Sequence, residues 1–388
     1  MNDNGTLKFW LILIALTVAV MDTALYFTLH QLNKSRNIFY ASRTITPAQL
    51  QSFLDERFHP VLGWNIAHSE KNSLGARGPR EYPEKERYKI KIFGDSFSYG
   101  AEVTSEQTFE AVIERERGWE CLNFGVGAYG TDQAVLKYEL TDVPTQYTVL
   151  GVLSENIGRV VSFYPAWYMR HWAPPKPRFF LQGDSLHLLQ TPINSVEKAQ
   201  ALLDPEFVNS LRPFDYWPSF YEQKLHAPAR LHWPAFVTVF SHLDFFLSRA
   251  RLEILRRVAP DWDIEKQTYK YYHLYEGESE ALQIFTRIID RFIAVARNRG
   301  EIPIIVIFAD QFSLDLMRKY GRNPYQPLLE HVRKTGVAYL DIGEVFRDEN
   351  YGAYFNFYNS HYSPQGNRRV AEALVAVIDA LEGRAPTQ

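Results

Sequence analysis

Short apolar runs alternate with amphipathic stretches along most of the chain, and this alternation predicts strands and helices in turn. Five runs rich in β-branched and aromatic residues predict buried strands, at 88–93, 121–124, 147–153, 303–309 and 337–342. Apolar positions at helical spacing predict helices at 106–117, 278–297 and 364–381. Such alternation indicates a three-layer, doubly wound α/β fold around a parallel sheet.

Residues 162–277 interrupt the alternation between the third and fourth strands. Two apolar runs around Gly183-Asp184 predict a hairpin, and 236–258 predicts one amphipathic helix that carries four arginines. The insertion is rich in aromatic residues: Tyr164, Trp167, Tyr168, Trp172, Tyr216, Trp217, Tyr221 and Trp233. These side chains suit stacking on sugar rings, although packing in the core or in a lid is the first interpretation. An insertion at this edge of the sheet usually shapes the substrate site.

A long apolar run near the N-terminus covers residues 9–27 and contains one charge, Asp22. At the rise of an α-helix it spans about 28 Å, enough to cross the core of a bilayer. Trp10 and Tyr26 lie near its two ends, where such rings favour the membrane interface. We therefore expect an uncleaved transmembrane anchor over 9–28. Asp22 would either reach the interface or contact a membrane partner.

The remaining organisation follows from these elements. Residues 1–8 form a short tail, and 29–85 reads as an exposed connection in which 59–65 packs on the main domain. The main domain covers 86–382 and includes the insertion, and 383–388 form a second tail.

Composition narrows the classes of function. The 388 residues carry a net charge of −3, and the absence of a basic run argues against nucleic-acid binding. The single cysteine, Cys121, excludes an intrachain disulfide and a cysteine-rich metal site. It lies on a predicted strand, so we expect a buried, inert thiol. No cofactor or metal ion is expected.

The clearest chemical signal is Gly94-Asp95-Ser96, which directly follows the first predicted strand. A serine at the carboxyl end of a strand, just before a helix, lies where open α/β sheets bind ligands. Ser96 is therefore the candidate nucleophile, although Gly-Asp-Ser is also common in ordinary turns. Ser185 ends a second copy of the tripeptide, but its predicted hairpin makes that copy a turn.

Three further stretches follow strands and can converge with Ser96. Gly127 and Ala128 lie in a glycine-rich turn that could aim backbone N–H groups at an oxyanion. Asn156 could donate its amide to the same oxygen, or it could cap a helix. His361 precedes the helix that opens at Pro364 and could act as a general base, although a lone histidine is more often a packing residue.

Taken in this order, the blocks resemble the SGNH (GDSL-type) hydrolases, over 88–160 and 303–382. The resemblance implies a flavodoxin-like sheet, Ser96 as the nucleophile and His361 as the base. Asn156 falls on the oxyanion asparagine of the family. The oxyanion glycine of the family falls on Ala128, with Gly127 just before it. Alanine is tolerable there unless φ is positive.

The acid of the triad departs from the family pattern. Relatives carry an aspartate two or three residues before the histidine, and those positions are Asn359 and Tyr358. Asn359 could orient His361 as a neutral partner. Asp341 at the end of the fifth strand, a backbone carbonyl or the more remote Asp310 could serve instead, and a non-catalytic member remains an open alternative.

A serine, a base and an oxyanion hole together mean acyl transfer through an acyl-enzyme. The first expectation is a serine esterase that removes O-acyl groups from a carbohydrate outside the cytoplasm. The second is an O-acetyltransferase of an exported polysaccharide, because membrane-anchored relatives include such proteins. The third is a pseudoenzyme that only binds glycan.

Overall fold

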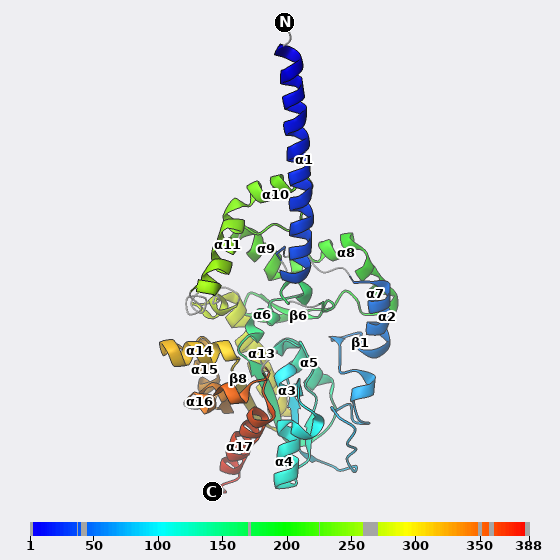
Figure 1. Cartoon of the computed structure of the whole chain (residues 1–388). Helices are drawn as coiled ribbons and strands as arrows, with labels where there is room; N and C mark the ends of the chain where they lie inside the picture. The colour runs from blue at the N-terminus through cyan, green and yellow to red at the C-terminus, as the bar shows by residue number, and fades with distance from the viewer. Residues whose placement is uncertain are drawn as a thin grey trace.

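The computed structural model describes residues 3–36, 38–39, 45–169, 172–224, 226–258, 271–347, 351–356 and 361–384. Figure 1 shows one long helix, α1, projecting from a body in which helices surround a sheet. The C-terminal helix lies at the opposite end of the molecule from the N-terminus.

The centre of the body is a parallel sheet of five strands in the order β4-β3-β5-β8-β9. The strands are β3 (Tyr88–Phe93), β4 (Cys121–Asn123), β5 (Thr145–Leu153), β8 (Ile302–Phe308) and β9 (Ala338–Asp341). All neighbouring pairs are parallel, with Ile92 beside Val149 and Val149 beside Ile304. Nearly every residue of β3, β5 and β8 is buried, as expected where helices cover both faces. The predicted doubly wound fold is confirmed.

Helices cover both faces of this sheet. α4 (Phe109–Arg117) and α17 (Pro364–Leu381) pack against each other, and α5 (Thr131–Leu140) packs against α13 (Glu280–Asn298). Right-handed crossovers place the first pair on one face and the second pair on the other, because the chain reverses direction in the sheet after β4. The helices α14 (Gln311–Tyr320), α15 (Gln326–Lys334) and α16 (Ile342–Phe346) flank β9 in sequence.

The segment expected to be an exposed connection instead joins the main core. It forms α2 (Pro47–Glu56), β1 (Phe58–His59) and β2 (Gly63–Trp64). Leu50, Leu62 and Trp64 are buried in the same hydrophobic cluster as the side chains of the sheet, which removes their apolar surface from water. The predicted packing of 59–65 is confirmed.

The insertion begins with the predicted hairpin, β6 (Arg178–Gln182) and β7 (Ser185–Leu189). Its turn contains Gly183 at φ +59°, and Ser185 is exposed there, so the second Gly-Asp-Ser is a turn. Three short helices follow: α7 (Val196–Ala199), α8 (Pro205–Ser210) and α9 (Tyr216–Lys224). Tyr164, Trp167 and Trp217 are buried in the core, as the first interpretation expected, whereas Trp233 is 65% exposed.

The predicted helix over 236–258 is wrong in one respect, because it is two helices. α10 (Ala235–Ser241) ends at His242, whose φ of −128° and ψ of 36° leave the helical region. α11 (Leu243–Val258) then begins in a new direction. Apolar periodicity continues through the break, so the pattern alone did not reveal it.

α1 (Asp3–Arg36) extends further at both ends than the apolar run predicted for the anchor. Within the described residues it is the one helix long and apolar enough to cross a membrane, by length and composition. Asp22 is 2% exposed, and its carboxylate accepts hydrogen bonds from α10. Its partner therefore lies within the chain.

Candidate active site

The nucleophile candidate lies on a tight turn between β3 and the single-turn helix α3 (Ser96–Tyr99). The turn needs glycine at position 94, since a Cβ there would lie 2.1 Å from Ser98 Oγ and 2.7 Å from the carbonyl oxygen of Gly151. Asp95 caps α3, and its carboxylate accepts a hydrogen bond of 2.9 Å from the N–H of Phe97. Ser96 thereby stands at the first position of α3, at the carboxyl edge of the sheet.

The structure brings His361 to this serine from the other end of the chain. The Nε2 atom of His361 lies 2.9 Å from Ser96 Oγ. The carbonyl oxygen of His361 accepts a hydrogen bond of 2.8 Å from the N–H of Asn356, which fixes the backbone on one side. Ser363 caps α17 and fixes it on the other. The predicted pair of nucleophile and base therefore has hydrogen-bonding geometry.

The carboxylate that completes the site is Glu102. Its Oε1 lies 2.6 Å from Nδ1 of His361, on the side of the ring away from Ser96. Glu102 follows the nucleophile by six residues and has φ +69°, a conformation that is costly for a residue with a side chain. The sequence analysis missed Glu102 because it sought the acid near the histidine, and no local pattern marks a glutamate in this loop.

The acids predicted from sequence lie elsewhere or are not described. Asn359 falls outside the described residues, so its role stays a prediction. Asp341 accepts hydrogen bonds from the hydroxyl of Tyr325 at 2.8 Å and from the N–H of Gly343 at 2.9 Å. Burial raises the pKa of Asp341 to about 6. Asp310 caps α14. Among the described residues, the carboxylate on His361 belongs to Glu102.

The predicted oxyanion turn lies next to the nucleophile. The N–H of Val126 donates a hydrogen bond of 3.0 Å to the carbonyl oxygen of Gly94. Ala128 has φ +68°, a positive value that is unfavourable for alanine, and glycine at this position would relieve the strain. No group of the described residues accepts a hydrogen bond from the backbone N–H of Ser96 or Ala128. Both donors are therefore free for a ligand oxygen.

Asn156, the third oxyanion candidate, is the first residue of α6 (Asn156–Val160) and is fully buried. Its Nδ2 lies 3.3 Å from Thr131 Oγ1, and its Oδ1 has no partner among the described residues. A buried amide with unused capacity is costly unless a ligand or water satisfies it. Asn156 is thus placed at the carboxyl end of β5, as predicted.

Arg159, one turn further along α6, ties these blocks together. Its Nη1 donates to the carbonyl oxygen of Tyr129 at 3.0 Å and lies 3.6 Å from Asp95 Oδ2. Burial raises the pKa of Asp95, and the positive charge of Arg159 opposes that rise. One guanidinium therefore joins the nucleophile turn, the oxyanion turn and the helix of Asn156.

No family profile and no curated protein matches this sequence. Solved structures match with probability 1.00 but low identity. They include a member of the lipolytic protein G-D-S-L family from Veillonella parvula DSM 2008, with 10% identity over 74% of this chain and 97% of that chain, TM-score 0.36. The lipase/acylhydrolase from Enterococcus faecalis is 9% identical over 78% of this chain and 99% of that chain, with a TM-score of 0.37. The acetyl xylan esterase AlAXEase is 10% identical over 75% of this chain and 99% of that chain, with a TM-score of 0.36.

The chain is similar in fold to these three proteins.

A buried cluster supports the loop that carries both Ser96 and Glu102. Arg77 donates to the carbonyl oxygen of Val103 at 3.1 Å, and its guanidinium lies over the ring of Tyr99. Beneath it, Glu110 accepts a hydrogen bond of 2.7 Å from Asn123 Nδ2. The second oxygen of Glu110 has no partner among the described residues. Burial raises the pKa of Glu110 to about 7, so a neutral carboxyl is favoured below that pH.

The raised pKa of Glu110 predicts how stability changes with pH. Folded protein holds this proton up to about pH 7, whereas the unfolded chain releases it near 4.5, so stability falls as pH rises between these values. Glu110→Gln imitates the neutral form, so its free energy of unfolding should not fall over this range. The advantage of the variant over wild type should grow by about 2–3 kcal/mol from pH 5 to pH 8. The measurement is the free energy of urea unfolding of the full chain in detergent. The exposed Glu106→Gln is the control, and an equal gain at both pH values would contradict the assignment.

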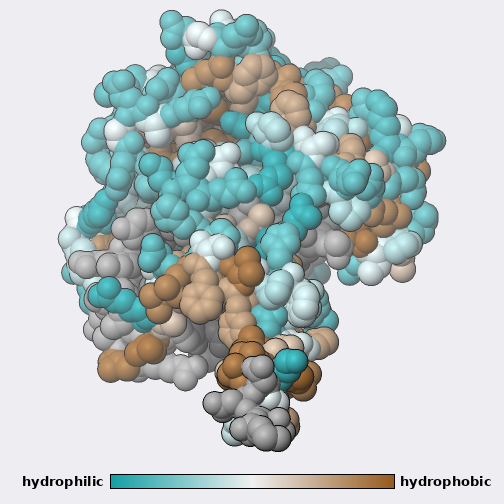
Figure 2. All heavy atoms as spheres, turned by 90° about the horizontal axis from the view of Figure 1, so that it is seen from above, coloured by the Kyte–Doolittle hydropathy of each residue, from teal (hydrophilic) through white to brown (hydrophobic). Residues whose placement is uncertain are grey.

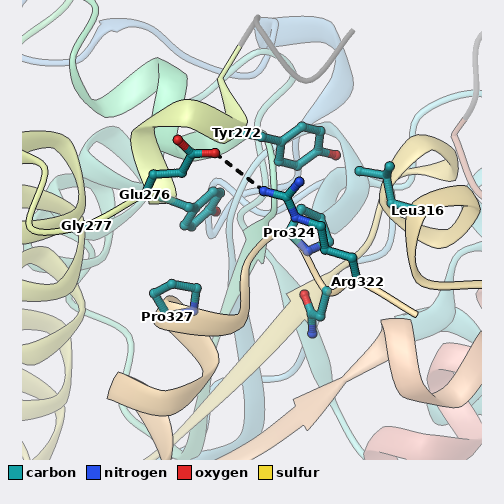
Figure 3. A pocket seen from close by; sticks show the side chains of 9 residues that line it. Tyr272, Glu276, Gly277, Leu316, Arg322, Pro324 and Pro327 are labelled. Atoms are coloured by element: carbon teal, nitrogen blue, oxygen red, sulfur yellow. Dashed lines mark hydrogen bonds and ion pairs between the residues drawn. The ribbon is translucent and has the colours of Figure 1, made fainter. Parts of the chain in front are cut away.

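One hollow of about 400 Å³ lies away from this site, between Tyr272, Glu276 and Arg322, with the ion pair of Glu276 and Arg322 at its rim (Figure 3). It includes neither Ser96 nor His361. Within the described residues, no cluster of His, Cys, Asp or Glu could hold a metal ion.

Proposed function

We propose that this protein is a serine esterase of the SGNH type that acts through an acyl-enzyme. The observation that carries the proposal is the continuous chain from Ser96 Oγ to His361 Nε2 and from His361 Nδ1 to Glu102 Oε1. Glu102 provides the carboxylate that this chain lacks in the positions just before His361, where relatives carry an aspartate. A complete triad favours catalysis over glycan binding alone.

The steps follow from this geometry. Ser96 Oγ attacks the ester carbonyl while His361 Nε2 takes its proton, and Glu102 stabilises the imidazolium. The backbone N–H groups of Ser96 and Ala128 and the amide of Asn156 are the proposed donors to the oxyanion. The proton then passes from His361 to the leaving alkoxy oxygen, which departs as the alcohol. Water attacks the acyl-enzyme and gives its proton to His361, which releases the acid and restores Ser96.

Exposure of the site favours water as the acceptor. The side chains of His361 and Glu102 are 22% and 24% exposed, so solvent reaches the base. A transferase must keep water from its acyl-enzyme, whereas a hydrolase needs water there. We therefore place hydrolysis first and transfer to a sugar hydroxyl second. An O-acylated carbohydrate is the substrate class that the resemblance suggests.

The N-terminal helix supports a membrane-anchored enzyme. Residues 5–21 of α1 are exposed along their whole length, and the apolar side chains among them would be unfavourable in water. We propose that α1 stays on the protein as an anchor, with the catalytic domain outside the cytoplasm. Reporter fusions after Leu32 would establish the side, and a mature N-terminus beyond residue 28 would contradict the anchor.

The reaction is tested with the full chain in detergent and a chromogenic acetyl ester, with and without an oligosaccharide acceptor. We expect acetate release at the same rate in both conditions. Acetylated oligosaccharide formed in place of acetate would make the protein a transferase. Absence of turnover, together with absence of labelling by a fluorophosphonate, would leave the non-catalytic alternative.

A further inference from the structure

The insertion makes an unusual contact with α1. Asp22 lies in the middle of the apolar helix, and its carboxylate accepts hydrogen bonds from the N–H groups of Ala235 at 3.0 Å and Phe236 at 2.7 Å. These donors are the first residues of α10, which lies beside α1 and above the rest of the insertion (Figure 1). The free N–H groups of a helix start and a buried carboxylate satisfy each other.

The position of this contact along α1 indicates how α10 would lie relative to a membrane that α1 crosses. Side chains 5–21 are exposed, whereas Asp22 and Leu29 are buried and face the body. The exposed apolar part from Leu7 to Met21 rises about 22 Å, which is less than the roughly 30 Å of a bilayer core. Continuing the span to Phe27 gives about 31 Å. An anchor that fills the core therefore has α10 beside its last turns, inside the boundary of one leaflet.

α10 exposes apolar side chains at this level. Trp233, just before α10, and Val237 and Phe240 on α10 are more than half exposed and follow helical spacing. α11 runs on from α10 toward the body, away from the N-terminal end of α1 (Figure 1). Viewed along α1, hydrophobic side chains gather around the projecting helix and beside it, while much of the remaining face is hydrophilic (Figure 2).

The charges of α11 fit the edge of a membrane. Its sequence carries Arg249, Arg251, Arg256 and Arg257 against Asp244 and Glu253, a surplus of positive charge. Arginines next to exposed apolar side chains and a tryptophan are typical of protein segments at the surface of an anionic membrane. Asp22 holds the start of α10 beside a part of α1 that lies within the core of the bilayer when α1 is the anchor, so lipid is the occupant that faces these side chains.

We propose that α10 forms a second membrane contact, embedded in the leaflet beside α1 and joined to it by Asp22, with α11 leading from it to the body. The occupant of the apolar face of α10 is the lipid bilayer. This contact goes beyond ester hydrolysis and rests on α1 being the anchor. It fixes the body against the membrane at two places, so the body cannot rotate freely about a single helix.

The test measures the depth of single labels in vesicles. The full chain with Val237→Cys or Phe240→Cys carries an environment-sensitive fluorophore, because the native Cys121 is buried. Vesicles contain phosphatidylcholine and phosphatidylglycerol with a quencher on the acyl chains. We expect quenching at least about twofold stronger than for Glu116→Cys on α4, at the far end of the body. Leu13→Cys on α1 reports the anchor itself.

Each outcome decides the proposal. Strong quenching at positions 13, 237 and 240 supports it. Quenching at 13 alone overturns it and leaves a single anchor. Labels at 237 and 240 that are shielded from both the lipid quencher and aqueous iodide would overturn lipid as the occupant and mean that a second copy of the chain covers these side chains. Asp22→Ala should reduce quenching at 240 and leave it unchanged at 13, and an unchanged value at 240 would remove Asp22 from the contact.

Discussion

Ser96→Ala is expected to abolish turnover of an acetyl ester, with a loss in kcat of about 10⁵-fold or more. Alanine removes the only atom that can form the acyl-enzyme, and His361 then has no hydroxyl to activate at 2.9 Å. The residual rate would come from the oxyanion donors alone. The measurement is kcat for the full chain, combined with covalent labelling by a fluorophosphonate.

Ser185→Ala is the matched control, because Ser185 ends the second copy of the same tripeptide, on a hairpin where it is exposed. It should retain the activity of wild type and full labelling. Labelling that survives in Ser96→Ala, or that disappears in Ser185→Ala, would move the nucleophile away from the turn after β3.

Glu102→Gln is expected to lower kcat by about 10³–10⁴-fold while leaving the fold intact. Glutamine preserves the size of the side chain, but it removes the charge that stabilises the imidazolium 2.6 Å away. It can also present an amide N–H to Nδ1 and so favour the wrong tautomer of His361. The measurement is kcat across pH 6 to 9 on the same ester used for Ser96→Ala.

Two further variants separate Glu102 from the acids predicted from sequence. Asp341→Asn should keep kcat near that of wild type, since the contacts of Asp341 are with Tyr325 and Gly343. Asn359→Ala should have only a small effect. A large loss for either variant, together with an active Glu102→Gln, would transfer the role of the acid to that residue.

Sequence predicts the sheet well because its strands are buried on both faces. Runs such as β5 and β8 are apolar almost without interruption, so the sequence pattern identifies these strands without knowledge of what packs against them. Ser96 and His361 were predictable for a related reason, since each follows or precedes a clear element. Their positions at one edge of the sheet then follow from parallel strand order.

The rest depends on backbone angles and on distant contacts. Glu102 reaches His361 only because its φ is +69°, and the positive φ of Ala128 is equally invisible in the sequence. The break at His242 interrupts a stretch whose apolar spacing continues. The partner of Asp22 lies 213 residues away, so no local pattern could identify it.

The spacing of the triad has a consequence for the timing of synthesis. The nucleophile and the carboxylate leave the ribosome almost together, whereas His361 follows Ser96 by 265 residues. At about 5–20 residues per second this interval lasts about 13–50 s. During that time the growing chain already exposes a serine turn but has no base to activate it. On the proposed mechanism, ester hydrolysis can begin only when His361, just before α17, has reached Ser96, after α1 and the insertion have been made.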